Sequence, residues 1–433
     1  MPLGGGVESL QTLVENPVSP IFRFAGVQFR SLTTGRYTGS WTDISPYVIK
    51  WGSLELAVDD VRFNSFTDKG ISLVVNNDNG AFNHHSNAAS LWYGTLTRYR
   101  TLLRVQAGYY DTDMSTQVPA NSILGIFVLD QEISIDSSSN QVQLRASSLK
   151  SVFDQVVVTD IGGIFNVTLT ADAIIGKMRD YTDGSGVFVF REFITSTAWS
   201  ITAGVHNYVL TTDLAANMSA WDIMDKLAES EGYVIMINRT GGIEFRPRQA
   251  RQSTSQFSFY GQNFPRPSIM QINELKEAWD KYFNYYQLKF LPVETSTSFV
   301  HAGTTTIVNP SNPSWFAGAR TYQFENTFPS DTATAQSIVN SLFGLSASTV
   351  SSVPIEISFD ATFIPGLEVM DRVDVSYRSY DLANNALWDV MIWDTDKWGQ
   401  EGVNFDLNST LSFITAVKTD LDQLTTNFTV RII

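Results

Sequence analysis

The sequence predicts a mainly β fold with an α+β insert, in which two β-barrel-like domains flank a small helix-plus-hairpin domain. Aromatic residues make up 12% of the chain and charged residues only 17%, a balance that suits pleated, half-buried strands. Segments of alternating apolar and polar residues recur with turn signals roughly every 10 to 20 residues, as in all-β folds. Helical periodicity is confined to three short segments.

At 433 residues the chain is long enough for about three domains. Composition shifts divide it into an N-terminal arm rich in Gly and Pro, a first β-barrel-like domain, a small α+β domain, a polar linker and a second β-rich domain with one helix. The expected boundaries are 1–20, 21–152, 153–250, 251–268 and 269–433, in that order.

In the first β domain, alternation of apolar residues predicts strands at 21–29, 52–58, 71–75, 101–109, 122–130 and 141–145. The segment Asn76–Gly80 joins two apolar runs with residues that tolerate positive φ and cap their own backbone. We therefore expect two hairpins of an antiparallel barrel in the stretch from Ile71 to Asp130.

The α+β domain is predicted from two helices and a hairpin. Thr170 is a plausible N-cap for a helix over 169–180. Ser219, with Asp222 three residues later, begins a second helix that Gly232 ends. The hairpin follows at once, with its turn at 238–242.

The second β region begins with an aromatic strand over 282–290 and continues through a polar loop at 296–318. A third helix is expected from Asp331, capped by Ser330 and ended by Gly344. Strands follow at 355–359, 367–377, 388–393, 410–417 and 428–432. Arg104-Val105 and Tyr109 recur as Arg372-Val373 and Tyr377, each 268 positions later; if this echo is a repeat, the two β regions are related domains.

Composition excludes several functional classes. The chain has no cysteine, hence no disulfide, thiol nucleophile or thiolate metal site. Its net charge of −15 argues against gripping DNA but is compatible with a conduit through which DNA slides. The N-terminal segment does not read as a signal peptide, and no apolar run is long enough to predict a membrane span.

Patterns that could carry chemistry are weak. His84-His85, Asp59-Asp60 and the segment Asp394–Glu401 suggest a metal site, an acid/base pair and a calcium loop, and each is better explained as a loop, strand end or turn. Gly4–Gly6 lacks the strand and helix of a phosphate-binding loop. A tryptophan group could stack on a sugar, although core Trp is commoner in strands; it comprises Trp388, Trp393 and Trp398. We therefore expect no catalytic, cofactor-binding or metal residues and no cofactor.

Several segments together resemble tail-tip and baseplate hub proteins of tailed bacteriophages and related tail-like particles. They occur in that family's order over about residues 70 to 433. These segments are 75–82 with 91–94 and 103–105, 125–130 with 142–149, 220–230 with 232–237 and 242–245, 364–375, and 413–417 with 428–432. Each segment alone is a hairpin or helix-hairpin found in many β proteins, and the order carries the resemblance.

The resemblance implies a non-enzymatic structural protein of the virion, at the tail tip or baseplate. It implies a homotrimer in which two related β-barrel domains per subunit build a ring that joins the tail tube or distal tail protein to a spike, fibre or receptor-binding protein. Phage DNA would pass through its channel without specific binding. A distal tail or fibre-attachment protein is the near alternative; a carbohydrate-binding module or glycan hydrolase is the alternative from another class.

The loop from Asn83 to Ser90 is interpreted as a structural excursion or a contact between subunits. Its deletion is expected to spare folding and weaken ring assembly, because it follows a turn and contributes no apolar strand. Light scattering after size-exclusion chromatography measures the oligomer, and an oligomer unchanged by the deletion contradicts the contact.

Overall fold

The computed structural model of the chain describes most of the sequence, and every structural statement below refers to these residues. They are 10–15, 20–30, 37, 40–58, 66–83, 101–110, 117–118, 122–129, 134–136, 140–157, 161–182, 186, 188–194, 198–211, 217–247, 254–261, 267–290, 298–303, 320–326, 328–329, 331–350, 354–381 and 402–432.

The first sheet contains most of the strands before residue 150, in the order β2-β1-β7-β9-β11-β6-β3. A short helix, η1 (Ser45–Tyr47), links the terminal strands β2 and β3, so the sheet curls back on itself. The strands are β1 (Ile21–Phe29), β2 (Thr42–Asp43), β3 (Val48–Lys50), β6 (Ile71–Asn76), β7 (Thr101–Tyr110), β8 (Gln117–Val118), β9 (Ile123–Leu129), β10 (Ser134–Asp136) and β11 (Gln141–Ser148). β7 pairs along its length with β1, from Ile21↔Tyr109 to Phe29↔Thr101.

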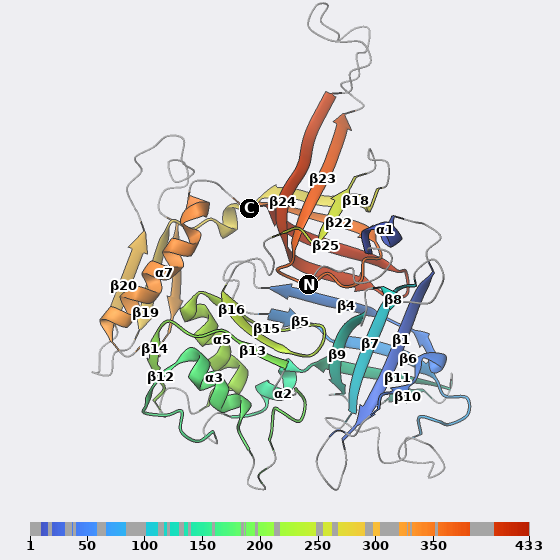
Figure 1. Cartoon of the computed structure of the whole chain (residues 1–433), viewed down its shortest axis with the longest axis horizontal. Helices are drawn as coiled ribbons and strands as arrows, with labels where there is room; N and C mark the ends of the chain where they lie inside the picture. The colour runs from blue at the N-terminus through green and yellow to red at the C-terminus, as the bar shows by residue number, and fades with distance from the viewer. Residues whose placement is uncertain are drawn as a thin grey trace, which may run out of the picture.

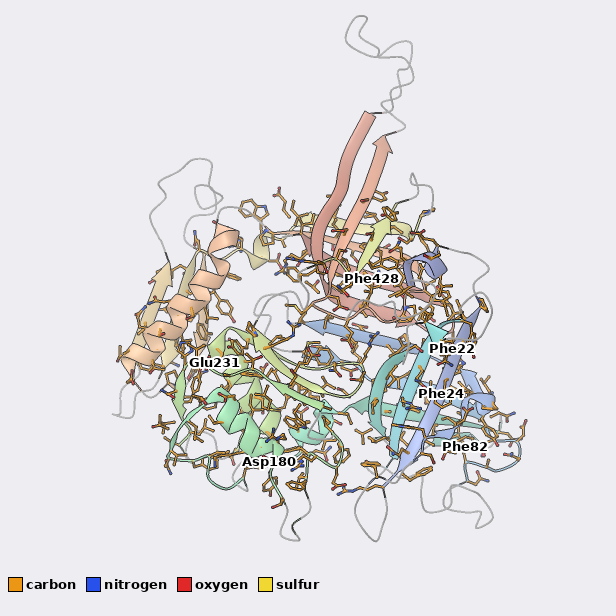
Figure 2. All side chains as sticks on the ribbon, in the orientation of Figure 1. Phe22, Phe24, Phe82, Asp180, Glu231 and Phe428 are labelled. Atoms are coloured by element: carbon orange, nitrogen blue, oxygen red, sulfur yellow. The ribbon has the colours of Figure 1, made fainter. Side chains whose placement is uncertain are left out.

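The turn after β6 does not join paired strands, so the hairpin expected there is wrong, whereas the one between β7 and β9 is confirmed. β6 pairs with β11 and β3 instead. The Asn77 side chain accepts the Phe82 N–H at 2.8 Å and donates to Asn83 at 2.7 Å. These bonds hold the turn, and Phe82, labelled in Figure 2, is buried with its ring centroid 5.5 Å from that of Tyr47.

The second sheet has the order β17-β23-β24-β25-β22-β18, and β4 and β5 extend it from β24. Three buried rings at 4.9 to 5.9 Å centroid distances, Phe259, Phe359 and Phe428, form its centre. The strands are β4 (Ser53–Val58), β5 (Phe66–Asp68), β17 (Phe257–Tyr260), β18 (Ile269–Glu277), β22 (Ile355–Thr362), β23 (Arg372–Asp381), β24 (Gly402–Asp420) and β25 (Thr425–Ile432). The predicted mainly β fold is confirmed.

The chain crosses from the first sheet to the second and back between Gly52 and Gly70. After β3, the strand β4 pairs with β24, from Ala57↔Ala416 to Ser53↔Asp420. Both glycines have positive φ, 68° and 72°. A Cβ on Gly52 would lie 2.4 Å from the Ser72 carbonyl oxygen, and one on Gly70 would lie 2.2 Å from that of Ala146. Only glycine fits both the conformation and the space.

This crossover places the two sheets in direct contact. Their buried side chains form one continuous core, and the Tyr109 hydroxyl donates to the Phe363 carbonyl across it at 2.6 Å. In sequence the α+β part lies between the two β regions, but in space it lies beside them (Figure 1).

A second core surrounds helix α5 (Ala220–Glu231) of the α+β part and extends to buried residues of both sheets, among them Leu102, Val128 and Phe66. Its first half comprises α2 (Lys150–Asp154), β12 (Thr168–Thr170), α3 (Ala171–Arg179), β13 (Trp199–Ile201), β14 (Asn207–Val209), α5, β15 (Tyr233–Ile237) and β16 (Ile243–Pro247). Its second half comprises β19 (Tyr285–Phe290), β20 (Ser298–Gly303), β21 (Thr321–Glu325) and α7 (Thr332–Val350), preceded by η4 (Trp279–Lys281).

Thus α7 and its sheet pack with α5, although they lie within the segment 269–433. Likewise β4 and β5, within 21–152, belong to the second sheet. The domain boundaries drawn from the sequence remain predictions. The second sheet contains strands from the segments 21–152, 251–268 and 269–433.

The helix ends test the predicted caps. α5 has the expected capping box between Ser219 and Asp222, and Gly232 ends it with φ 68°. For α7, Asp331 accepts the Thr334 N–H at 2.7 Å, so Asp331 takes the capping role assigned to Ser330, which lies outside the described residues. α7 also continues past Gly344 to Val350, because a glycine weakens a helix without ending it unless it turns left-handed.

Within the expected N-terminal arm, helix α1 (Leu10–Val14) is docked on the second sheet. Its Leu10, Leu13 and Val14 are buried. The Gln11 side-chain amide donates to the Ser258 carbonyl at 3.0 Å and accepts the Ser258 N–H at 3.1 Å. Gln11 therefore pairs with β17 as a neighbouring strand would and covers that edge.

Gly52→Ala is expected to lower the free energy of unfolding by roughly 1 to 3 kcal/mol, because the strained φ and the contact with Ser72 add. Chemical denaturation measures the change. Gly162→Ala is the matched control, since nothing lies within 4 Å of its Cβ position and its φ is not positive. Equal stabilities of the two variants would contradict the role of Gly52.

Candidate functional site

The residues weighed from the sequence for chemistry lie outside the described residues. They are Gly4–Gly6, Asp59, Asp60, His84, His85, Trp388, Trp393, Trp398 and the segment 394–401. Their interpretation as loop, turn or core residues stays a prediction. Among the described residues no group of three or more His, Asp and Glu could hold a metal ion, and none of the described helices is long and apolar enough to cross a membrane.

A concentration of buried titratable groups surrounds Glu231, the last residue of α5 (Figure 2). Its carboxylate accepts the backbone N–H of Val205 at 2.8 Å and that of His206 at 3.0 Å. The His206 ring lies between Glu231, at 3.3 Å from Nδ1, and the Ser337 hydroxyl of α7, at 3.2 Å from Nε2. The cluster thus connects α5, the segment before β14, and α7.

Two tyrosines enclose the same carboxylate. Burial, reinforced by the Glu231 charge, raises the pKa of Tyr208 well above its usual value. Burial and then Glu231 also raise the pKa of Tyr233. Both phenols therefore stay neutral at physiological pH and can pack beside the Glu231 carboxylate without charge repulsion.

A second set of bonds joins the same end of α5 to β21. The Tyr322 hydroxyl donates to Glu229 at 3.1 Å. The Asn326 amide donates to the Lys226 carbonyl at 3.1 Å and to the Ser230 hydroxyl. Together the two sets fasten the halves of the α+β part to each other.

This cluster joins α5 to the segment before β14 and to α7. Both Glu231 oxygens are engaged by backbone donors, and Glu231 lines neither of the grooves nearby. One groove of about 470 Å³ lies between α5 and β21 and the other, of about 480 Å³, lies along α3. Sequence reasoning missed the cluster, although one signal was available. Two carboxylates, Glu229 and Glu231, occupy the last turn of α5, where the helix dipole disfavours anions.

The second sheet has a projecting ribbon and a terminal strand. The ribbon of β23 and β24 stays paired out to Asp381↔Gly402 and projects from the body (Figure 1). On the other side of the sheet, β18 is a terminal strand of which only Ile269 is buried. Among the described strands none pairs with its outer edge.

β18 escaped the sequence analysis because its apolar residues are three apart. Irregularities between Ile269 and Gln271 and between Ile272 and Glu274 each insert one residue. Consequently Ile269, Ile272 and Leu275 all lie opposite core residues of β22, namely Ala361, Phe359 and Ile357. A period of two, the usual strand signal, cannot detect such a strand.

No protein family and no curated protein matches the sequence. Among solved structures, the chain is similar to a tail protein from Neisseria meningitidis MC58, with 10% identity over 95% of this chain and 96% of that one and a TM-score of 0.48. It is also similar to the prophage tail protein gp18 from Listeria monocytogenes EGD-e, with 11% identity, 94% of each chain and a TM-score of 0.47.

A third similar structure is the 43 kDa tail protein of prophage MuSo2 from Shewanella oneidensis, with 8% identity over 94% of this chain and 98% of that one and a TM-score of 0.43. All three of these solved structures are named as tail proteins.

Glu231→Gln is expected to lower the free energy of unfolding by roughly 2 to 4 kcal/mol, because an amide group would face backbone donors that now meet an oxygen. Thermal and chemical denaturation measure the loss. Glu325→Gln is the control, since its carboxylate is 56% exposed beside Lys289 and its removal should change stability by no more than about 0.5 kcal/mol. A Glu231→Gln variant as stable as the control would contradict the anchoring role.

Proposed function

We propose that the protein is a non-enzymatic structural subunit of a phage tail tip, which forms a trimeric hub ring between the tail tube and a distal spike, fibre or receptor-binding apparatus. The order of the sequence segments first suggests this role. The observation that carries it is that two curled β sheets are locked into one body by the β4 crossover and a shared core.

That body suits a ring mechanically. Three copies place six β units around an axis, and a closed ring buries the strand edges that a lone subunit exposes. Because β4 pairs with β24, the two sheets cannot swing apart without breaking that ladder. Load applied at one sheet therefore passes to the other through backbone hydrogen bonds.

The charge of the chain supports passage of DNA rather than binding. With a net charge of −15, the subunit repels phosphate groups and offers few of the contacts that hold a duplex in place. A ring of such subunits would let DNA slide through.

The non-enzymatic part of the proposal is supported by the Glu231 cluster, whose carboxylate is 0% exposed and accepts two backbone N–H groups, so that a substrate in solution does not reach it. The alternative of a glycan-binding or glycan-hydrolysing protein depends on Trp388, Trp393 and Trp398, outside the described residues, so no structural observation favours it.

Mass photometry and negative-stain class averages of the purified protein test the proposal. We expect trimers and ring-shaped particles whose fraction rises with protein concentration, and co-purification with tail tubes. A protein that stays monomeric up to high concentration, and that tail tubes do not retain, would overturn it. Compact monomers that bind glycans would favour the alternative instead.

A further inference from the structure

Exposed apolar side chains mark two terminal strands, one in each sheet. The large hydrophobic side chains most exposed among the described residues are Ile49, Val157, Val167, Val205, Met270 and Leu275. Three of these lie on terminal strands: Ile49 on β3, and Met270 and Leu275 on β18. Exposed fractions of 52%, 49% and 40% leave them in contact with water in a single subunit.

The two strands share an unusual geometry. Ile49 is the extra residue where β3 slips against β6, between Val48↔Val75 and Lys50↔Val74. Met270 is the extra residue where β18 slips against β22. Residues inserted in this way interrupt the ladder and redirect a side chain. In each sheet an apolar side chain is thus exposed at the rim.

Charge distinguishes the two surfaces. β3, its neighbour β6 and the next strand, β11, carry Lys50 and Arg145, both exposed, and no carboxylate within the strands. The nearby carboxylate of Asp422 accepts the Trp51 N–H just after β3. β18 carries Glu274 and Glu277 against a single cation, Lys276. Like surfaces facing each other would therefore bring equal charges together, whereas β18 against β3 brings opposite charges together.

We propose that β18 of one copy of this chain packs against the β3 rim of the next copy, with Met270 and Ile49 in contact. This inference rests on the proposed function, because it names the interface by which the hub ring would close. The two surfaces differ, so the contact is head-to-tail, and repeated around an axis it generates a ring. Around this ring, the first sheet of each subunit contacts the second sheet of its neighbour.

The absence of cysteine from the chain allows a direct test by site-directed cross-linking. In an Ile49→Cys and Met270→Cys double variant, a short bismaleimide is expected to give covalent dimers and closed trimers on denaturing gels. Each single variant is expected to give no dimer, since each surface meets the other and not itself. Val205→Cys with Met270→Cys is the matched control, because Val205 is 71% exposed but lies on the α+β part.

Charge reversal gives a second, independent measurement. Lys50→Glu is expected to raise the protein concentration at which half the rings form by about tenfold, and adding Glu274→Lys should recover most of that loss. Both side chains are exposed, so the variants are expected to keep the fold. Circular dichroism and unfolding temperatures equal to those of the wild type would verify this.

The outcomes separate this interface from the proposed function. Rings that form while the double variant cross-links no better than the Val205 control would overturn the interface and leave the hub role standing. Dimers from Met270→Cys alone would overturn the head-to-tail contact in favour of β18 meeting itself. A wild-type protein that never assembles would overturn both.

Discussion

Two glycines and one strand pairing determine how the parts of this protein are arranged. Gly52 and Gly70 adopt left-handed conformations against carbonyl oxygens that leave no room for a side chain. Between them the chain leaves the first sheet, and β4 enters the second by pairing with β24. The shared core, with the Tyr109 hydroxyl bonded to Phe363, can form only because that pairing brings the sheets together. The β units are therefore one mechanical body.

Buried polar bonds help to hold the α+β part together. There the two halves share the apolar core around α5, and Glu231, Glu229 and Asn326 at the end of α5 add polar bonds between them. Buried polar groups fix a single geometry when all are satisfied, since misalignment leaves donors or acceptors without partners. The apolar core between the sheets and the polar bonds at the end of α5 together give a rigid subunit.

Structural features that depend on a few neighbouring residues could be predicted from the sequence. The capping box of Ser219 and Asp222, the glycine stop at Gly232 and most strands were predicted because caps and alternation are properties of short segments. The pairing partners of the strands could not be predicted from the sequence. Nothing local distinguishes a β4 that pairs with β6 from one that pairs with β24, and β18 was missed because its two extra residues convert a period of two into three. Likewise Glu231 meets His206 only through tertiary packing, and the acidic end of α5 was its one local sign.

The pairing of β4 with β24 also sets an order of events during synthesis. Ala57 and its partner Ala416 are separated by about 360 residues. At ribosomal rates this distance takes on the order of 20 to 70 s to translate. Throughout that interval β4 can pair only with β5, the strand that follows it, and a chain interrupted before β24 never forms the pairing that connects the two sheets. Completion of the rigid body is therefore coupled to completion of the polypeptide, so that truncated chains lack the frame on which an assembly could be built.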